Sequence, residues 1–310
     1  MKKNYFITGG LGFIGKAISK SLLDDGHKVI ILDNNFRKKN NFIKHKNLTI
    51  YRGDIREKKN LLKIKQKIHS VIHLAAINGT NHFYEIPDLV LDVGVKGMIN
   101  ILEFCKEKKI KEIFLASSSE VYQDAPFIPT NEKVRMIIPD PHNPRFSYSS
   151  SKIISEMLAL HNSFVNKIVI FRPHNIYGPD MGFNHVIPET IIKILNAKKQ
   201  FTIQGNGKNK RSFCYIDDFI KGIRILLKKG KHKEIYNIGY DEEISITQLC
   251  KLIMKLFNKR LKIIKSENKL INTKRRLPDI KKLQKLGYKP SVKLNQGLLK
   301  TIEWYMKNAK

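Results

Sequence analysis

The sequence predicts an α/β fold in which a doubly wound parallel sheet is joined to a smaller C-terminal α/β region. Short apolar segments alternate with helical patterns through the first half of the chain, which is typical of parallel strands connected by helices. After Tyr177 this alternation gives way to shorter segments separated by turn sequences such as Gly205-Asn-Gly207. We therefore expect one domain over residues 1–177 and a second region over residues 178–310.

The expected strands are short, apolar and separated by helical segments. They are Asn4–Thr8, Lys28–Asp33, Leu48–Tyr51, Ser70–Leu74, Glu112–Ala116 and Ile168–Phe171. A helix should follow the first strand, because Ile14, Ile18 and Leu22 recur at helical spacing. Two longer helices are expected over residues 89–106 and 147–161, and their apolar faces predict a homodimer contact.

Composition and charge exclude several classes of protein. No apolar stretch approaches the roughly 18 residues that a membrane span needs, and the start of the chain has no apolar segment long enough for a signal peptide, so a cytoplasmic location is expected. Cys105, Cys214 and Cys250 are widely spaced, which favours buried thiols over a disulfide framework or a metal site. The formal net charge is +31, but the lysines are spread along the whole chain, so nucleic-acid binding is not expected.

A glycine-rich loop between the first strand and its helix predicts a dinucleotide site on a Rossmann sheet. Gly9, Gly12 and Gly15 are spaced so that bare backbone can approach a pyrophosphate and the amino end of the helix can face it. Asp33 ends the second strand, where a carboxylate can accept both ribose hydroxyls and repel a 2′-phosphate, so NAD is favoured over NADP. Asp54 ends the third strand and is either a partner of the adenine amino group or an ordinary turn aspartate.

Tyr148 and Lys152 are four residues apart on an expected helix, so their side chains lie on one face. An unperturbed tyrosine titrates near ~10, and a neighbouring ammonium or a cationic nicotinamide ring stabilises its phenolate. Such a tyrosine can take a proton from a hydroxyl while the carbon beneath loses hydride to NAD. A single pair with this spacing is usually an ordinary feature of a helix surface, but the glycine loop makes dehydrogenase chemistry at a sugar or alcohol carbon the better interpretation.

Several further motifs follow in a fixed order along the chain. They are TGGLGFIG at 8–15, LDNN at 32–35, GDI at 53–55, HLAA at 73–76, SSSEVY at 117–122, YSSSK at 148–152, FRPHNIYGP at 171–179, GNGKNKRSFCYIDD at 205–218, YNIG at 236–239 and RRLPD at 275–279. With these motifs the chain resembles the extended short-chain dehydrogenase/reductase superfamily, and within it the NAD-dependent nucleotide-sugar epimerase/dehydratase family. The resemblance covers nearly the whole chain.

The resemblance implies tightly held NAD and further residues that bind it. Besides the three loop glycines, Asp33 and Asp54, these cofactor-binding positions are Phe13, Ile14, Asn34, Ile55, Leu74, Ala75, Ala76, Tyr148 and Lys152. No metal is implied.

The resemblance also implies how a nucleotide-diphospho-sugar is bound. Ser118 matches the catalytic serine or threonine that hydrogen-bonds the sugar hydroxyl beside Tyr148. Asn175 occupies a position that contacts substrate phosphate or sugar, and Arg211 and Arg276 match arginines that bind the diphosphate. A guanidinium group is well shaped for phosphate oxygens.

Glu120 leaves the reaction open among three possibilities. In family dehydratases and decarboxylases an acidic residue at this position takes part in chemistry after the first oxidation, whereas a 4-epimerase needs only the return of hydride to the other face. Ser118 in place of threonine and the absence of an aspartate before Glu120 count against a dehydratase, so 4-epimerisation is the first expectation, dehydration with Glu120 as base the second and decarboxylation of a sugar acid the third. Glu120 is either a catalytic residue or a structural one. Gln123 replaces the glycine that is usual after Val-Tyr in many members. A non-catalytic, NAD-sensing or RNA-binding member is the alternative from a different class.

Overall fold

The computed structural model describes residues 2–37, 44–266 and 273–308, which form two compact units. The first unit comprises Met1–Val121, Met136–Arg172 and Gly222–Tyr236, and the second comprises Tyr122–Arg135, Pro173–Lys221 and Asn237–Lys310. Each unit is therefore built from three separate stretches of the chain, whereas the expected division has a single boundary after residue 177. The assignment of cofactor binding to one part and substrate binding to the other stays a prediction.

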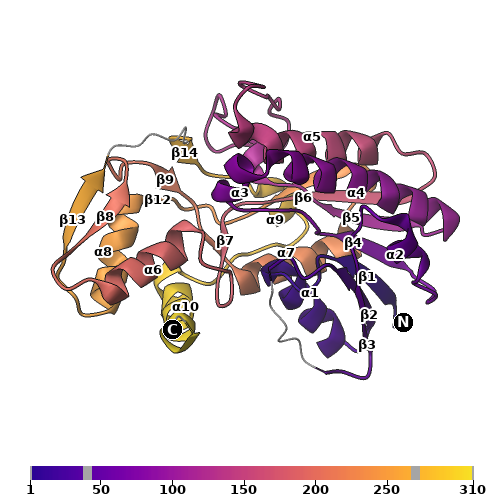
Figure 1. Cartoon of the computed structure of the whole chain (residues 1–310), viewed down its shortest axis with the longest axis horizontal. Helices are drawn as coiled ribbons and strands as arrows, with labels where there is room; N and C mark the ends of the chain where they lie inside the picture. Colours follow the sequence, from indigo (N-terminus) through magenta and orange to yellow (C-terminus); the bar gives the residue numbers. More distant parts are fainter. Residues whose placement is uncertain (1, 38–43, 267–272, 309–310) are drawn as a thin grey trace. The chain divides into compact units, whose positions relative to one another are not determined.

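A seven-stranded sheet forms the centre of the first unit (Figure 1). Its strands are β1 (Asn4–Thr8), β2 (Lys28–Asp33), β3 (Leu48–Arg52), β4 (Ser70–His73), β5 (Glu112–Ala116), β6 (Lys167–Pro173) and β11 (Glu234–Ile238), in the order β11-β6-β5-β4-β1-β2-β3. Every pair from β6 to β3 is parallel. The strand order reverses between β1 and β4, the kind of position at which ligands bind to such sheets. The predicted fold class is confirmed.

Helices cover both faces of this sheet, with α4 and α5 on one side and α1 and α7 on the other (Figure 1). The helical elements are α1 (Phe13–Asp24), α2 (Lys58–Leu62), α3 (Thr80–Glu85), α4 (Pro87–Glu107), α5 (Ser147–Leu160) and α7 (Ile216–Lys229), with 3₁₀ turns η1 (Ser119–Tyr122) and η2 (Pro144–Phe146). Phe6, Ile30 and Leu32 belong to the same buried core as the inward side chains of α4 and α5. Burial on both faces explains why these strands are almost continuously apolar.

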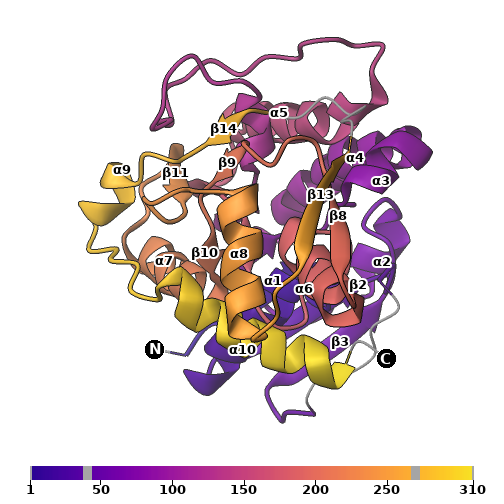
Figure 2. The ribbon, with the colours of Figure 1, turned by 90° about the vertical axis from the view of Figure 1, so that its left-hand side faces the viewer.

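The second unit is a smaller α/β region built from short strand pairs and helices (Figure 2). Its strands are β7 (Ile176–Tyr177), paired with β10 (Cys214–Tyr215); β8 (Gln200–Gln204), paired with β13 (Lys262–Ser266); and β9 (Lys210–Arg211), which lies between β12 (Ile244–Ser245) and β14 (Arg275–Arg276). Its helices are α6 (Val186–Asn196), α8 (Ile246–Leu256), α9 (Lys281–Gln284) and α10 (Leu294–Asn308), and α6, α8 and α10 contact one another. This region too was expected from the sequence.

Three local predictions can be compared with the structure. Cys105, Cys214 and Cys250 are buried thiols, as predicted. Gln123 has a φ of 46°, in the left-handed region that favours glycine, which accounts for the glycine that many family members carry there. Among the described residues, no helix has the length and apolar character that crossing a bilayer requires.

Candidate active site

The predicted cofactor residues follow the carboxyl ends of neighbouring parallel strands. Gly9, Gly12 and Gly15 follow β1, and Gly9 has a φ of +70°. A Cβ atom on Gly9 would lie 2.9 Å from the backbone of Ala75, and one on Gly15 would lie 2.3 Å from the carbonyl oxygen of Gly9. Only glycine fits either position. Gly12 has no side chain with which to cap α1, so the first amide groups of that helix remain suited to a pyrophosphate.

Asp33 is fixed at the end of β2, beside the glycine loop. Its Oδ2 accepts a hydrogen bond from the backbone amide of Leu11 at 2.9 Å, and its Oδ1 accepts one from the amide of Asn35 at 2.7 Å. The carboxylate is therefore oriented by the chain itself. This geometry fits a ribose site next to a pyrophosphate site, and the assigned contact with ribose remains a prediction.

Asp54, which follows β3, is held in an ion pair. Its two oxygens accept hydrogen bonds from Nε and Nη2 of Arg56 at 3.1 and 3.0 Å, and Asn34 Nδ2 donates to it at 3.2 Å. Burial alone would raise the pKa of Asp54, but the bonds from Arg56 and Asn34 outweigh burial, so the pKa lies below its usual value. Asn100 on α4 donates to the backbone carbonyl groups of Ile55 and Arg56, at 2.9 and 2.8 Å. Asn100 was not singled out from the sequence.

The segment after β4 is tied to β1 through one hydroxyl group. Thr8 Oγ1 accepts hydrogen bonds from the amides of Leu74 and Ala75, each at 3.2 Å, and lies 2.7 Å from His73 Nδ1. Burial, with a smaller contribution from Lys152, lowers the pKa of His73 to about 3. His73 is therefore neutral, and its contact with Thr8 helps to hold the backbone of β1 and β4 in place. Ala76 continues this segment, while Phe13 and Ile14 open α1.

Tyr148 and Lys152 lie together on α5, and both are buried. Lys152 Nζ donates to the carbonyl oxygen of Ala116 at 2.8 Å and lies 5.6 Å from the centre of the Tyr148 ring. Burial lowers the pKa of Lys152 to about 8, against an opposing effect of Glu156. Burial likewise raises the pKa of Tyr148 to about 12, although a hydrogen bond with Ser118 lowers it. The depression of the tyrosine pKa that the sequence suggested is therefore absent from the protein on its own, because burial outweighs the hydrogen bond with Ser118 and the charge of Arg37.

Glu120 lies in the same cluster, on η1, where its charge also raises the pKa of Tyr148. Its backbone amide donates to Ser118 Oγ at 3.1 Å, and its Oε2 accepts a hydrogen bond from Arg145 Nη2 at 2.8 Å. Arg145 in turn packs against Phe83, whose ring stacks on Tyr148 with centroids 5.0 Å apart and planes 11° apart. The sequence did not single out Arg145 or Phe83; only the position of Arg145, three residues before Tyr148, could have indicated it.

The three expected substrate residues meet in the second unit. Arg211 on β9 and Arg276 on β14 are register partners in adjacent parallel strands. Nη2 of Arg211 donates to the Thr273 carbonyl oxygen at 2.7 Å, and Nη2 of Arg276 donates to Thr273 Oγ1 at 3.0 Å. Asn175, with a φ of 41°, donates to the carbonyl oxygen of Ser212 at 2.8 Å. Two guanidinium groups on one small sheet, with the amide of Asn175 hydrogen-bonded next to it, can bind phosphate oxygens.

Arg275, the neighbour of Arg276, has a different environment. Its Nη2 lies 2.8 Å from Glu243, which also pairs with Lys210. Arg275 is thus held by an acidic partner that directly precedes β12 of the same small sheet.

Comparison with known proteins agrees with this geometry. A model of the NAD-dependent epimerase/dehydratase family matches residues 5–239. The chain belongs to this family. It is therefore an enzyme, its cofactor is NAD, and the Rossmann sheet with its glycine loop is the part of the chain that fits NAD.

Several family relatives are similar over almost the whole chain. A UDP-N-acetyl-alpha-D-glucosaminuronate decarboxylase of Bacillus cytotoxicus is 32% identical, with 98% of each chain covered. A dTDP-D-glucose 4,6-dehydratase of Dictyostelium discoideum is 30% identical, with 97% of this chain and 81% of the relative covered. Among solved structures, a UDP-N-acetylglucosamine 4-epimerase of Methanobrevibacter ruminantium, in complex with UDP-N-acetylmuramic acid, is 29% identical and superimposes with a TM-score of 0.88 over 99% of each chain.

Proposed function

We propose that this family member acts on a nucleotide-diphospho-sugar, oxidising carbon 4 to a ketone and then reducing the same carbon from its other face, which is 4-epimerisation. Tyr148 is the group that takes the proton of the sugar hydroxyl, and Ser118, hydrogen-bonded to Tyr148, aligns that hydroxyl. Lys152, fixed on the carbonyl oxygen of Ala116, holds positive charge beside the phenol. NAD, when bound, accepts hydride from the sugar carbon and adds a positive ring to the site.

The observation that favours 4-epimerisation is the environment of Glu120. Dehydration requires a base that removes a proton from carbon 5, and a base must have a free and basic carboxylate. Glu120 is instead paired with Arg145 at 2.8 Å, and the two side chains are only 17% and 9% exposed. An ion pair stabilises the ionised carboxylate and makes it a weaker base. A structural role for Glu120 suits a 4-epimerase, because hydride transfer out and back is complete without it.

Dehydration or decarboxylation through the same 4-keto sugar is the second candidate. The names of the curated relatives favour it, since they include dehydratases of dTDP-D-glucose and decarboxylases of UDP-linked sugar acids. In a dehydratase, Glu120 would have to leave Arg145 to act as the base. In a sugar acid whose carboxylate is attached to carbon 5, oxidation of carbon 4 gives a β-keto acid, which loses carbon dioxide without a base that removes a proton from carbon 5. A decarboxylase is therefore compatible with the ion pair of Glu120.

Recognition of the nucleotide diphosphate is assigned to Asn175, Arg211 and Arg276. Arg211 and Arg276 are register partners on neighbouring strands, so the two guanidinium groups can bind adjacent phosphates. The excess of positive charge over the whole chain also attracts a diphosphate.

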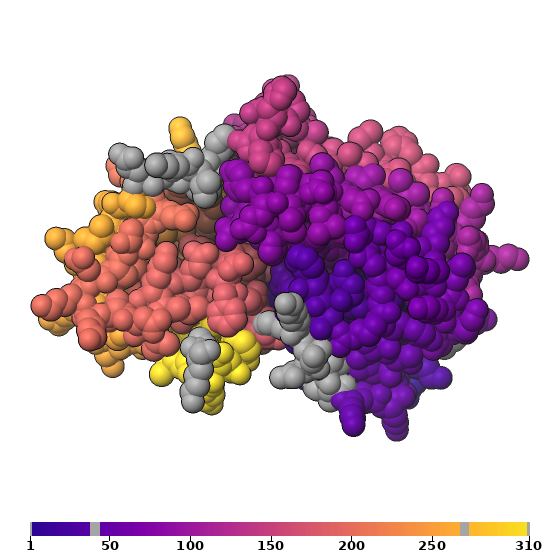
Figure 3. Space-filling model, viewed as in Figure 1, coloured from indigo at the N-terminus to yellow at the C-terminus, as the bar shows by residue number. Residues whose placement is uncertain are grey.

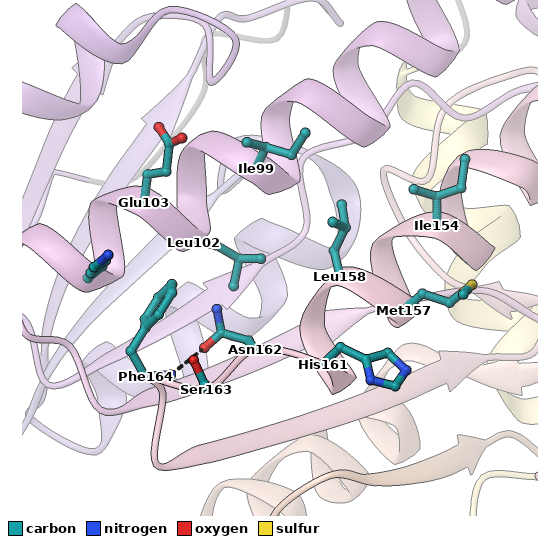
Figure 4. Close-up of a pocket in the computed structure, with 11 residues that line it drawn as sticks. Ile99, Leu102, Glu103, Ile154, Met157, Leu158, His161, Asn162, Ser163 and Phe164 are labelled. Carbon is teal, nitrogen blue, oxygen red and sulfur yellow. Dashed lines mark hydrogen bonds between the residues drawn. The ribbon is translucent and has the colours of Figure 1, made fainter.

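A homodimer through α4 and α5 is part of the proposal. A groove between these helices is lined by Ile99, Leu102, Glu103, Lys106, Ile154, Met157, Leu158, His161, Asn162, Ser163 and Phe164, and the side chains of the two helices border it from opposite sides (Figure 4). Ile99, Ile154, Met157 and Phe164 are exposed. Figure 3 shows the α3–α4 segment, in purple, at the molecular surface.

A second copy of the chain suits this groove for two reasons. Exposed apolar side chains on two adjacent helices are typical of a protein interface. Glu103 and Lys106 carry opposite charges on α4, so a two-fold axis can set each of them against the other on the partner.

The branch of the reaction is tested by mass spectrometry of the products from UDP-glucose, UDP-N-acetylglucosamine, dTDP-glucose and UDP-glucuronic acid. A changed sugar with unchanged mass supports 4-epimerisation, whereas loss of water or of carbon dioxide identifies the second candidate. The Glu120→Gln variant, which keeps size but removes the carboxylate, should lose less than about tenfold in rate, since a general base is worth ~10²–10⁴. A variant that reduces the cofactor and then stalls at the 4-keto sugar would contradict the proposal.

A further inference from the structure

Tyr148 and four neighbouring residues form a closed ring of contacts within the first unit. Arg145 donates to Glu120 at 2.8 Å, and the Glu120 amide donates to Ser118 Oγ at 3.1 Å. Ser118 is hydrogen-bonded to Tyr148, and the Tyr148 ring stacks on Phe83. The guanidinium carbon of Arg145 lies 5.2 Å from the centre of the Phe83 ring and closes the circle. Arg145 is therefore connected to Tyr148 by two separate routes.

We propose that Arg145 is a positioning residue for Tyr148, holding the ring through Phe83 and neutralising Glu120 on the opposite route. The inference rests on the proposed role of Tyr148 as proton acceptor, and it is independent of whether the 4-keto sugar is epimerised, dehydrated or decarboxylated.

The burial of Arg145 argues for a role other than stability. Arg145 is 7% exposed, and its Nη1 is buried without a hydrogen-bond partner in the part of the chain that the structure describes. Leaving such a donor unpaired destabilises a fold, and a buried ion pair can usually be replaced by well-packed apolar side chains without loss of stability. An arginine at this position therefore contributes something that a methionine of similar length would not, and the remaining candidate is its charge beside Glu120.

The charged groups near Tyr148 come from several elements. They are Lys152 on the same helix, Glu120 on η1, Arg145 on η2 and Arg37 after β2. Glu120 disfavours ionisation of the phenol and Arg37 favours it, while Ser118 favours it through a hydrogen bond. Without Arg145 the carboxylate of Glu120 would lose this compensating charge, so its effect on the phenol would grow and the phenol would need a higher pH to ionise.

The test compares Arg145→Met, Arg145→Lys and the double variant Arg145→Met/Glu120→Gln. Arg260→Met is the matched control, because it removes an exposed arginine of the second unit. Three properties are measured: the thermal unfolding temperature, the pH profile of kcat/KM on the nucleotide sugar of the panel that turns over fastest, and the tyrosine band of the near-ultraviolet circular dichroism spectrum. For each protein, the spectrum of its Tyr148→Phe version is subtracted. The difference is the signal of the Tyr148 ring, and it is measured without substrate.

Arg145→Met should unfold at a lower temperature than the wild type, because the buried carboxylate of Glu120 loses this ion-pair partner, whereas the double variant should unfold closer to the wild-type temperature. Arg145→Met should also lose at least about tenfold in kcat and move the acidic limb of the profile, where kcat/KM rises with pH, to higher pH by about half a unit or more. It should also weaken the Tyr148 band. In the double variant the acidic limb should lie closer to its wild-type position, because the carboxylate that opposes ionisation of the phenol is gone. Arg145→Lys keeps the positive charge beside Glu120, so the acidic limb of the pH profile should stay in place. It lacks the planar guanidinium group that packs on Phe83, so kcat should fall.

The proposal is overturned by a folded Arg145→Met variant whose profile and Tyr148 band both match the wild type, or by a double variant whose limb stays displaced. If Arg145→Met does not fold, a displaced limb in Arg145→Lys overturns the proposal as well. Failure of the proposed function is recognised separately, by an active Tyr148→Phe variant. The circular dichroism comparison needs no turnover, so it tests the positioning role in either case.

Discussion

Burial raises the pKa of Tyr148 to about 12, so in the protein alone the phenol is protonated at neutral pH. Its ionisation therefore depends on positive charge that arrives with the cofactor and on the charges held around it. Burial also lowers the pKa of Lys152, to about 8, so at neutral pH most molecules still carry the lysine charge beside the phenol. At the residue scale, the chemistry of the site is decided by desolvation and by a few fixed partners.

Tyr148→Phe should reduce turnover by ~10²–10⁴ while NAD and substrate affinities stay close to wild type, because only the proton acceptor is removed. Steady-state rates and calorimetric titration of each ligand measure the two effects. Retention of more than about a tenth of the wild-type rate would show that another group accepts the proton.

Asp33→Ala should weaken NAD binding and reduce the discrimination against NADP, because this carboxylate, held by the amides of Leu11 and Asn35, is assigned to the ribose hydroxyls. Binding constants for both cofactors provide the measurement. An unchanged ratio of NAD to NADP affinity would mean that Asp33 does not face the ribose.

Single residues were predictable from the sequence where a local motif carries them. The glycines of the loop, and the Tyr148 and Lys152 pair, lie within short patterns whose spacing has a physical meaning. Arg145 and Asn100 could not be predicted from the sequence, because the partner of each comes near only on folding. Arg145 donates to Glu120, and Asn100 donates to the backbone after β3.

At the scale of elements, apolar periodicity located β1, β2 and β5 with their observed bounds. These strands are buried, so their sequences carry a continuous apolar signal. The seventh strand of the sheet, β11, was not predicted as a strand, because it comes from the distal half of the chain and only pairing with β6 reveals it. The 3₁₀ turns that carry Glu120 and Arg145 are likewise too short to give a periodic signal.

Gly94 lies at the contact between α4 and α5, where there is no room for a side chain. A Cβ atom on Gly94 would lie 2.5 Å from Cβ of Ser151, which is on the catalytic helix. Gly94→Val should therefore push the helices apart and destabilise the protein by about 1–3 kcal/mol. Chemical denaturation measures this, with Lys96→Val as a control at an exposed position of the same helix. Equal stability of the two variants would contradict the close packing of α4 on α5.

At the scale of the whole molecule, the sequence predicted two regions but not how their segments alternate. Val121 and Tyr122 are adjacent in the chain and belong to different units, as do Arg172 and Pro173. A division drawn from composition follows the order of the sequence, whereas the observed units are defined by which segments pack together. This difference explains why the order of motifs identified the family more readily than it identified the boundaries.

The proposed homodimer predicts that Met157→Glu, which places a charge in the groove between α4 and α5, shifts the protein toward the monomer. Met157 is 53% exposed, so the substitution should not disturb folding of the single chain. Leu299→Glu on α10, another exposed apolar position, is the control. Analytical ultracentrifugation measures the molar mass, and a wild-type protein that is monomeric at micromolar concentration would rule the interface out.

The central claim is that hydride leaves carbon 4 of a nucleotide sugar and returns to the same carbon. The most direct test uses the active nucleotide sugar labelled with deuterium at carbon 4, followed by nuclear magnetic resonance and mass spectrometry of the product. The account predicts slower turnover than with the unlabelled sugar and a product of inverted configuration that keeps its deuterium at carbon 4. Deuterium found at carbon 6 together with loss of water, or exchanged into solvent, would contradict it.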